Sequence, residues 1–185
     1  MNINDILDHP ELKWNWGYVS RNLSVTIDVV LLNINKPWSW NWLSSHTNIS
    51  MSDIESHMDL SWDWGGVSNN PNVTMTMIEA HPDKQWNWFG ISQTMKLTVD
   101  LLRQYPDKPW NFYKMSGCNP SITLELLLAT PDLPWNYEYL SINECLTMDM
   151  VLAFPDKDWG VVSRNKGVTM SDIESRMDLS WDWYW

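Results

Sequence analysis

The stretch TVDLLRQYPDKPW, residues 98–110, carries all the signals of one short helix. Thr98 stands before an apolar run, where its hydroxyl oxygen can accept a hydrogen bond from a free N–H group of the first turn. Val99 and Leu102 then share one face of the helix. Pro106 disfavours the helical conformation for the residue before it. We therefore expect a helix of about two turns that begins after the Thr and ends before the Pro.

The same pattern recurs along the whole chain with a period of about 24 residues. Tryptophans mark the period at successive spacings of 24, 24, 24, 24, 25, 24 and 22 residues. A Ser or Thr precedes each later Trp by 12 residues, so we assign the variation in length to the loop before this hydroxyl residue. We expect a single repeat array over residues 1–185, with about seven and a half repeats. The repeat tryptophans are Trp14, Trp38, Trp62, Trp86, Trp110, Trp135, Trp159 and Trp181.

The second half of each repeat predicts another short helix, which we expect to begin at the repeat Trp. Proline directly before the Trp, as at Pro109, suits a first helical turn. The second aromatic of the repeat and the aliphatic residue three places later fall on one helical face. Val161 takes the place of the second aromatic in repeat seven, which we interpret as a loss of that residue and of two loop residues. A loop rich in asparagine follows, with Asn22, Asn70 and Asn165 in turn or left-handed positions.

Helices of two turns are not stable alone, so each repeat must be stabilised by packing on its neighbours. This requirement predicts an all-α fold, an α-solenoid of short helix–turn–helix repeats. A leucine-rich-repeat-like solenoid of strands and helices is the alternative, because Leu140 and Asn143 follow the Leu-x-x-Asn rhythm of that class. The Trp-x-Trp spacing of the second helix also fits a strand.

Composition excludes several classes of function. The 185 residues include 12 Lys and Arg against 23 Asp and Glu, a formal net charge of −11. Such a chain has no basic patch for nucleic acid, so we expect no nucleic-acid partner. No apolar run approaches the roughly 18 residues of a membrane helix, and the first residues lack the pattern of a signal peptide. We expect a cytoplasmic protein that is not secreted and has no membrane partner, and two cysteines are too few for a disulfide framework.

The repeat pattern resembles the tryptophan-rich tandem repeats, with a period of about 24 residues, of giant DNA virus proteins. The motifs that carry this resemblance are Pro106-Asp107-Lys108-Pro109-Trp110-Asn111-Phe112, Ser68-Asn69-Asn70-Pro71-Asn72-Val73-Thr74 and Asn119-Pro120-Ser121-Ile122-Thr123. The resemblance covers essentially residues 1–185. It implies a viral repeat protein in the host cytoplasm or in the virion, and it supplies no activity and no catalytic residues.

No set of residues in the sequence predicts catalysis, a metal site or a cofactor. The acidic residues of the turn before the repeat Trp are spaced one repeat apart, so we interpret them as solvated turn residues: Asp83, Asp107, Asp132 and Asp156. The four histidines have no metal-ligand spacing: His9, His46, His57 and His81. The periodic Ser and Thr residues are explained by helix capping. Cys118 and Cys145 are interpreted as unrelated free thiols.

We therefore predict a non-enzymatic scaffold that binds a protein partner, with a basic surface or peptide favoured by the negative charge. The second aromatics are the candidate interaction surface, against the simpler interpretation that they pack in the core: Trp16, Trp40, Trp64, Trp88, Phe112 and Tyr137. The alternative is a self-assembling structural protein, virion-associated, whose copies join end to end through an exposed C-terminal cluster. Trp181, Trp183, Tyr184 and Trp185 form that cluster. A third hypothesis is carbohydrate binding by an aromatic stripe.

Overall fold

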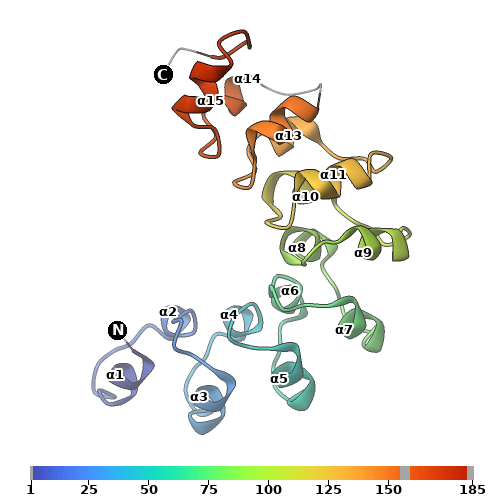
Figure 1. Cartoon of the computed structure of the whole chain (residues 1–185). Coiled ribbons are helices and arrows are strands. Elements are labelled where there is room, and N and C mark those ends of the chain that lie inside the picture. The colour runs from blue at the N-terminus through green and yellow to red at the C-terminus, as the bar shows by residue number, and fades with distance from the viewer. Residues whose placement is uncertain (1, 155–158, 183–185) are drawn as a thin grey trace. The chain divides into compact units, whose positions relative to one another are not determined.

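The computed structural model describes residues 2–154 and 159–182. Within these ranges the chain forms fifteen short α-helices and no strand (Figure 1). The helices follow the repeat pattern of the sequence, two to a repeat. The prediction of an all-α solenoid is therefore confirmed, and the alternative with strands is wrong for the described residues.

The first helix of each repeat, which we call the A helix, begins directly after the hydroxyl residue or after Asn2. Most A helices have six residues, in agreement with the two turns expected. They are α1 (Ile3–Leu7), α3 (Ile27–Leu32), α5 (Met51–Ser56), α7 (Met75–Ala80), α9 (Val99–Gln104), α11 (Leu124–Ala129), α13 (Met148–Ala153) and α15 (Met170–Ser175).

Side-chain capping explains where most A helices begin. Thr98 Oγ1 accepts a hydrogen bond from the N–H group of Leu101 at 3.1 Å. In α5 the cap is reciprocal, because Ser50 Oγ accepts from the Asp53 N–H group while the Asp53 carboxylate accepts from the Ser50 N–H group. Thr26 departs from the pattern, since its side chain makes no cap hydrogen bond. Capping was the basis of the helix prediction, and it holds at most of the repeats.

The second helix of each repeat, the B helix, begins two residues later than the sequence predicts. Helix α10 begins at Phe112 and not at Trp110, because the Asn111 side chain between them caps it by accepting from the Lys114 N–H group. The repeat Trp and the Pro before it belong to the connection between the two helices. The B helices are α2 (Trp16–Val19), α4 (Trp40–Ser44), α6 (Trp64–Val67), α8 (Trp88–Thr94), α10 (Phe112–Cys118), α12 (Tyr137–Leu140) and α14 (Trp159–Val162).

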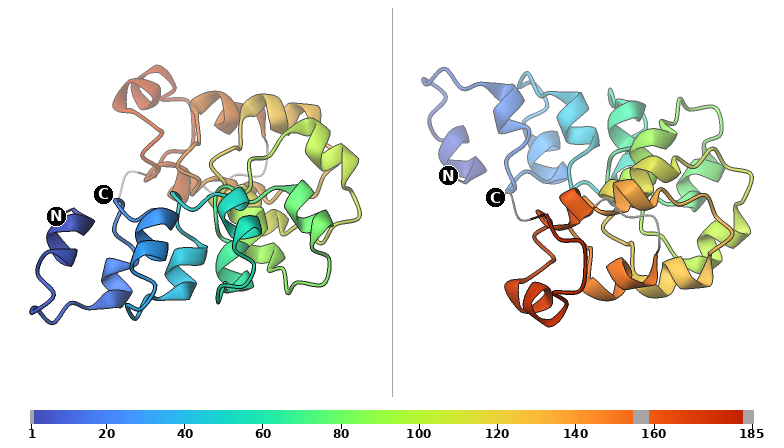
Figure 2. Two further views of the ribbon diagram at one scale, coloured as in Figure 1. Left: turned by 90° about the horizontal axis from the view of Figure 1, so that it is seen from below. Right: turned by 90° about the horizontal axis from the view of Figure 1, so that it is seen from above.

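The chain divides into two compact units, an N-terminal unit of residues 1–91 and a C-terminal unit of residues 92–185. In the N-terminal unit the A helices follow one another in one row and the B helices in a second row (Figure 1). Two further views show the same succession (Figure 2). Helix α4 packs on α6 in the first unit, and α10 packs on α12 in the second. The organisation of residues 1–185 as a single array stays a prediction.

The core of both units is built from aliphatic residues at fixed positions of the repeat. The residue before the cap and the residue four places after the cap are buried in nearly every repeat, as Ile49 and Ile54 are. The B helix adds the aliphatic residue three places after its aromatic, such as Leu43. Their burial supplies the apolar area that such short helices require.

Repeat seven has a different register from the one that the sequence suggests. The hydroxyl of Ser163 donates to the carbonyl oxygen of Trp159 at 2.7 Å. In other repeats the equivalent Ser donates in this way to the second aromatic, as Ser20 does to Trp16. The Trp159 ring also meets Trp181 edge to face at 5.2 Å, as a second aromatic meets the Trp of the next repeat.

Trp159 is therefore the second aromatic of its repeat, and the repeat Trp is the residue that is absent. The interpretation that Val161 replaces a lost second aromatic is wrong. The two missing residues lie before Trp159 and not in the loop, because the spacing from Trp159 to Ser163 matches that of the other repeats. Tyr137, which lacks a following repeat Trp, stacks on Phe154 with ring centroids 4.7 Å apart.

Candidate interaction surface

The second aromatics are half-buried where the structure describes them, and most of them contact the next repeat. The Trp40 ring meets the Trp62 ring edge to face, with centroids 5.2 Å apart and planes at 88°. Trp16 and Trp38, Trp64 and Trp86, and Phe112 and Trp135 have the same geometry, at 5.0 to 5.2 Å. Edge-to-face pairs stabilise by about 0.5–1.5 kcal/mol beyond the area that they bury. These residues join successive repeats, and their proposed role in binding stays a prediction.

The repeat tryptophans have a role that the sequence does not reveal. The indole N–H group of Trp62 donates to the carbonyl oxygen of His57, the residue that ends helix α5, at 2.8 Å. The same bond over five residues occurs at Trp14, Trp38, Trp86, Trp110, Trp135 and Trp181, at 2.8–3.0 Å. Each indole thus satisfies one of the carbonyls left free at the end of an A helix.

A serine at the end of the B helix links most of the described repeats to the next. Ser116 is fully buried, its hydroxyl donates to the Phe112 carbonyl oxygen at 2.8 Å, and its oxygen accepts from the N–H group of Asn136 at 2.9 Å. The accepted bond recurs at 2.8–2.9 Å on Ser20, Ser44, Ser68, Ser92 and Ser163. The sequence does not reveal this role of the serines, because the residue whose N–H group donates belongs to another repeat.

The loop asparagines Asn22, Asn70 and Asn165 begin turns, as the sequence predicts, but they are not left-handed. No described residue has a positive φ angle. From Asn70 onward they also hydrogen-bond to the preceding repeat, and we call this set of bonds the ladder. Asn70 donates to the carbonyl oxygens of Ser44, His46 and Ile49 in the preceding repeat, at 3.0–3.1 Å. Its own side-chain oxygen accepts from the N–H group of Asn72. Asn119, Asn143 and Asn165 make equivalent bonds.

His46 takes the asparagine position of the ladder in repeat two. Its Nε2 donates to the carbonyl oxygen of Asn22 at 3.1 Å, and its Nδ1 accepts from the N–H group of Asn48 at 3.1 Å. The ring therefore replaces both functions of an asparagine amide. The side chain is buried, which accounts for this histidine without a metal.

The exposed aromatic side chains lie elsewhere on the B helices, one or two places after the second aromatic. Tyr18 is 71% exposed and Trp42 is 41% exposed, and with Arg21 they line a hollow of about 330 Å³ in the N-terminal unit. The Arg21 guanidinium lies 4.3 Å from the centre of the Trp42 ring. Phe89 and Tyr113 are also exposed. We call Tyr18, Trp42, Phe89 and Tyr113 the exposed B-helix aromatics.

In the C-terminal unit, Tyr113 of α10 and Tyr139 of α12 lie ring against ring, with centroids 3.7 Å apart. A hydrogen bond with Tyr139 that favours the protonated phenol of Tyr113 raises the pKa of Tyr113 to about 12, and the charge of Glu138 contributes in the same direction. Gly117 makes room for this pair, because a Cβ atom on it would lie 2.2 Å from the Tyr139 ring. The ring pair thus lies within the electrostatic influence of a carboxylate.

Charged groups of the turns form surface pairs. Arg103 of α9 forms a two-pronged ion pair with Asp132, which follows α11, and the guanidinium lowers the pKa of that carboxyl. Lys84 lies 3.0 Å from Asp83 and lowers its pKa in the same way. Both carboxylates are solvent-exposed turn residues, as expected, whereas Asp156 lies outside the described residues. No group of three potential ligands for a metal gathers in the part of the chain described.

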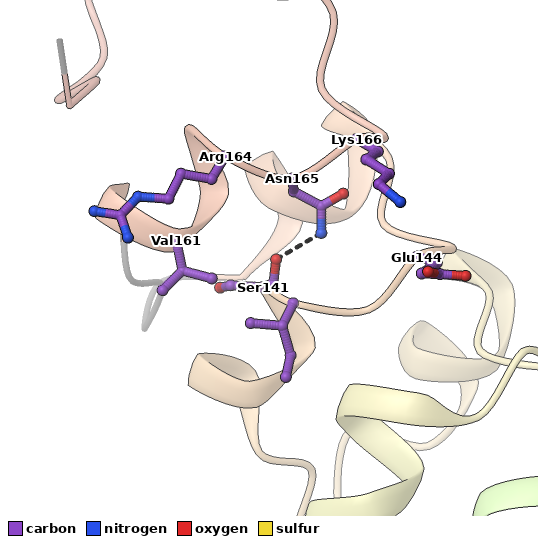
Figure 3. A pocket seen from close by; sticks show the side chains of 7 residues that line it. Ser141, Glu144, Val161, Arg164, Asn165 and Lys166 are labelled. Atoms are coloured by element: carbon purple, nitrogen blue, oxygen red, sulfur yellow. Dashed lines mark hydrogen bonds between the residues drawn. The ribbon is translucent and has the colours of Figure 1, made fainter. Parts of the chain in front are cut away.

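The C-terminal unit also has a hollow of about 360 Å³ beside α14 (Figure 3). Arg164 and Val161 lie on one side of it and Glu144 and Lys166 on the other, while Asn165 donates to the Ser141 carbonyl oxygen at 2.7 Å. Neither His nor Cys lines this hollow. Cys118 is exposed and Cys145 half-buried, and both are free thiols. The residues that line the hollow therefore include no pair of a nucleophile and a His base.

The C-terminal cluster expected from the sequence is described only at its first residue. Trp181 is buried, its indole donates to the Arg176 carbonyl oxygen, and its ring packs on Trp159. The expectation that Trp181 is part of an exposed end is therefore wrong. Trp183, Tyr184 and Trp185 lie outside the described residues.

Comparisons of the chain with protein-family models, with curated proteins and with solved structures give no match. No helix in the described ranges has the length and apolarity needed to cross a bilayer, since the longest ones have seven residues.

Proposed function

We propose that this chain is a non-enzymatic repeat scaffold that binds a basic segment of a partner protein through the exposed B-helix aromatics. The observation that carries the proposal is the set of exposed B-helix aromatics. Large aromatic side chains that remain exposed are frequent anchors in protein interfaces, because they bury much area at little cost in side-chain entropy. Tyr18 and Trp42 beside their hollow are the best-defined example.

The charge of the chain favours a basic partner. The formal net charge is −11, which attracts a cationic segment over a distance of about 10 Å at ordinary salt. Cations also bind to aromatic faces. The chain itself provides examples, since Arg21 lies over Trp42, Lys36 over Trp16 and Lys84 over Trp64. An arginine or lysine of a partner would find the same chemistry at Tyr113, where Glu138 adds a negative charge.

The resemblance to the repeats of giant DNA virus proteins is part of this proposal. A scaffold of that origin would act in the host cytoplasm or in the virion. Recruitment of basic viral or host proteins would then be its task, with no chemical step of its own.

The test is fluorescence anisotropy with a labelled oligoarginine peptide, titrated with the full chain at low and at high salt. We expect saturable binding that weakens as salt rises and that falls at least tenfold in the variant Trp42→Ser/Tyr113→Ser. The matched control is Leu152→Ser, an exposed apolar residue of α13, which should bind as the original chain does. Equal binding of an oligoglutamate peptide, or an unchanged affinity of the double variant, would refute the proposal.

A further inference from the structure

The hydrogen bonds of His46 fix the protonation state of its ring. The side chain is 6% exposed. The carbonyl oxygen of Asn22 can only accept, so Nε2 must carry a proton. The N–H group of Asn48 can only donate, so Nδ1 must carry none. The folded chain therefore holds the neutral ring, and we call these two bonds the His46 joint, because they connect repeats one and two.

A second proton on the ring would place two donors face to face. Both nitrogens of an imidazolium carry a proton, so the Nδ1–H group would point at the Asn48 N–H group across 3.1 Å. The ring must then turn away from Asn48, and this movement also withdraws Nε2 from the Asn22 carbonyl oxygen. A ring that has left the joint and lies in water has no such conflict. Acid therefore favours the open form of the joint over the closed form.

Charged groups near the joint do not offset this conflict. Among the described residues, none forms an ion pair with His46. Both cations of this region lie over tryptophan rings, the Asp53 carboxylate accepts from Ser50, and Glu55 pairs with His81. The loop of repeat three, which reaches the His46 carbonyl through Asn70, has no charged residue. The charged side chains of α2 to α5 and of the loops between them are Arg21, Asp28, Lys36, Asp53 and Glu55.

The other three histidines of the chain tolerate or favour a second proton. His57 Nδ1 donates to the Asp53 carbonyl oxygen at 2.8 Å, and an imidazolium keeps this bond. His9 and His81 lie 3.1 and 3.6 Å from glutamate oxygens, which stabilise a charged ring. The conflict with acid is therefore specific to His46.

The His46 joint also holds together the hollow of about 330 Å³ in the N-terminal unit. Asn22 directly follows Arg21, which lines the hollow from repeat one. Helix α4 carries Trp42, which lines it from repeat two, and ends two residues before His46. Asn48 adds a further connection, because its side chain donates to a backbone carbonyl of repeat one at 2.6 Å. Opening of the joint thus separates the two sides of the hollow.

We propose that His46 makes the joint between repeats one and two an acid-operated switch, which is closed at neutral pH and opens, together with the hollow, as the pH falls. Asparagine at the equivalent position, as at Asn70, connects repeats without a group that titrates in this range. Histidine is the side chain whose charge changes between about pH 5 and pH 8. The switch is thus a property that distinguishes this joint from the asparagine joints of the ladder.

The size of the response follows from proton linkage. A histidine in water has a pKa of about 6.5, so the ratio of open to closed joint rises up to about 25-fold between pH 7 and pH 5 when only the open form takes up the proton. The Asn48 amide reports this ratio, because its N–H group is the donor to Nδ1. The Asn72 amide is a control within the same chain, since it donates to the Asn70 side chain at the next joint.

The test is hydrogen exchange of the full chain at the two pH values, read as protection factors, which remove the intrinsic effect of pH on exchange. We expect the protection of the Asn48 amide to fall by about 10- to 25-fold from pH 7 to pH 5, and that of the Asn72 amide by less than about twofold. His46→Asn should abolish the fall at Asn48. His57→Arg is the matched control, because Arg176 takes this position in the equivalent segment, and it should keep the full fall.

An equal fall at Asn48 in the original chain and in His46→Asn would overturn the switch. Nitrogen-15 spectra of the imidazole ring provide a second measurement, which should show the Nε2–H form of His46 at neutral pH. A ring that carries its proton on Nδ1 at neutral pH would also overturn the proposal. The test contains no peptide, so its outcome is independent of the proposed function.

Discussion

Replacement of Ser116 by Ala tests the serine link between repeats. The side chain is fully buried, and its oxygen joins the Phe112 carbonyl at 2.8 Å to the Asn136 N–H group at 2.9 Å. The variant removes both bonds. Loss of a buried hydrogen-bond partner costs about 1–3 kcal/mol, because the remaining group keeps its desolvation penalty. We expect the free energy of unfolding to fall by about 1–3 kcal/mol.

Urea denaturation followed by far-UV circular dichroism measures this change, and Ser121→Ala is the matched control. Ser121 is half-buried, and its hydroxyl makes no hydrogen bond with a described residue, so its loss should change stability by no more than about 0.5 kcal/mol. Hydrogen exchange adds a local measurement, since the Asn136 amide should exchange faster in Ser116→Ala. Equal stability of the two variants, with an unchanged Asn136 amide, would refute the link.

Three further predictions follow from the contacts described. His46→Asn should change the free energy of unfolding by less than about 0.5 kcal/mol in urea denaturation, because an amide can replace both bonds of the ring. His46→Ala should lower it by about 1–3 kcal/mol, and equal losses in the two variants would contradict the role of His46 in the ladder. Trp62→Ala should cost about 3–5 kcal/mol and Trp62→Phe clearly less, because Phe keeps a ring edge and loses only the indole bond. The pKa of Tyr113 is raised from 10.0 to about 12, so between these values the folded chain keeps this proton while the unfolded chain has lost it. The contribution of Tyr113 to stability is therefore complete below pH 10 and is lost as the pH rises to about 12. Absorbance titration should show this late tyrosine, and Tyr113→Phe should remove the stability loss; no difference between the variants would contradict it.

The A helices could be predicted from the sequence because their signals are local. Thr98 and Pro106 mark the start and the end within one repeat, and α9 lies between them. The start of each B helix was harder to predict from the sequence. The Pro–Trp pair suggested that α10 begins at Trp110, whereas the Asn111 cap places its first residue at Phe112, two residues later. Periodicity alone also favoured aligning Trp159 with the repeat tryptophans, and only its contacts with Ser163 and Trp181 correct the register.

The interaction surface was less predictable than the fold, because exposure depends on the neighbouring repeat. The second aromatics, such as Trp40, have the character of a surface stripe in the sequence, yet the next repeat half-buries them. Tyr18 and Trp42 both lie two places after the second aromatic, and their exposure becomes visible only when the B helices are placed. The same limit applies to Asn70 and His46, whose hydrogen-bond partners lie in the repeat before them.

Edge-to-face contacts between aromatic rings stabilise the packing of adjacent repeats. A double-mutant cycle on Trp40 and Trp62 tests this stabilisation most directly, since their rings meet edge to face at 5.2 Å. The account predicts a coupling free energy of about 0.5–1.5 kcal/mol for this pair, measured by urea denaturation of Trp40→Ala, Trp62→Ala and the double variant. Trp16 and Trp62, which belong to repeats one and three, should show a coupling near zero. Equal couplings for the two pairs, or none for Trp40 and Trp62, would contradict the account.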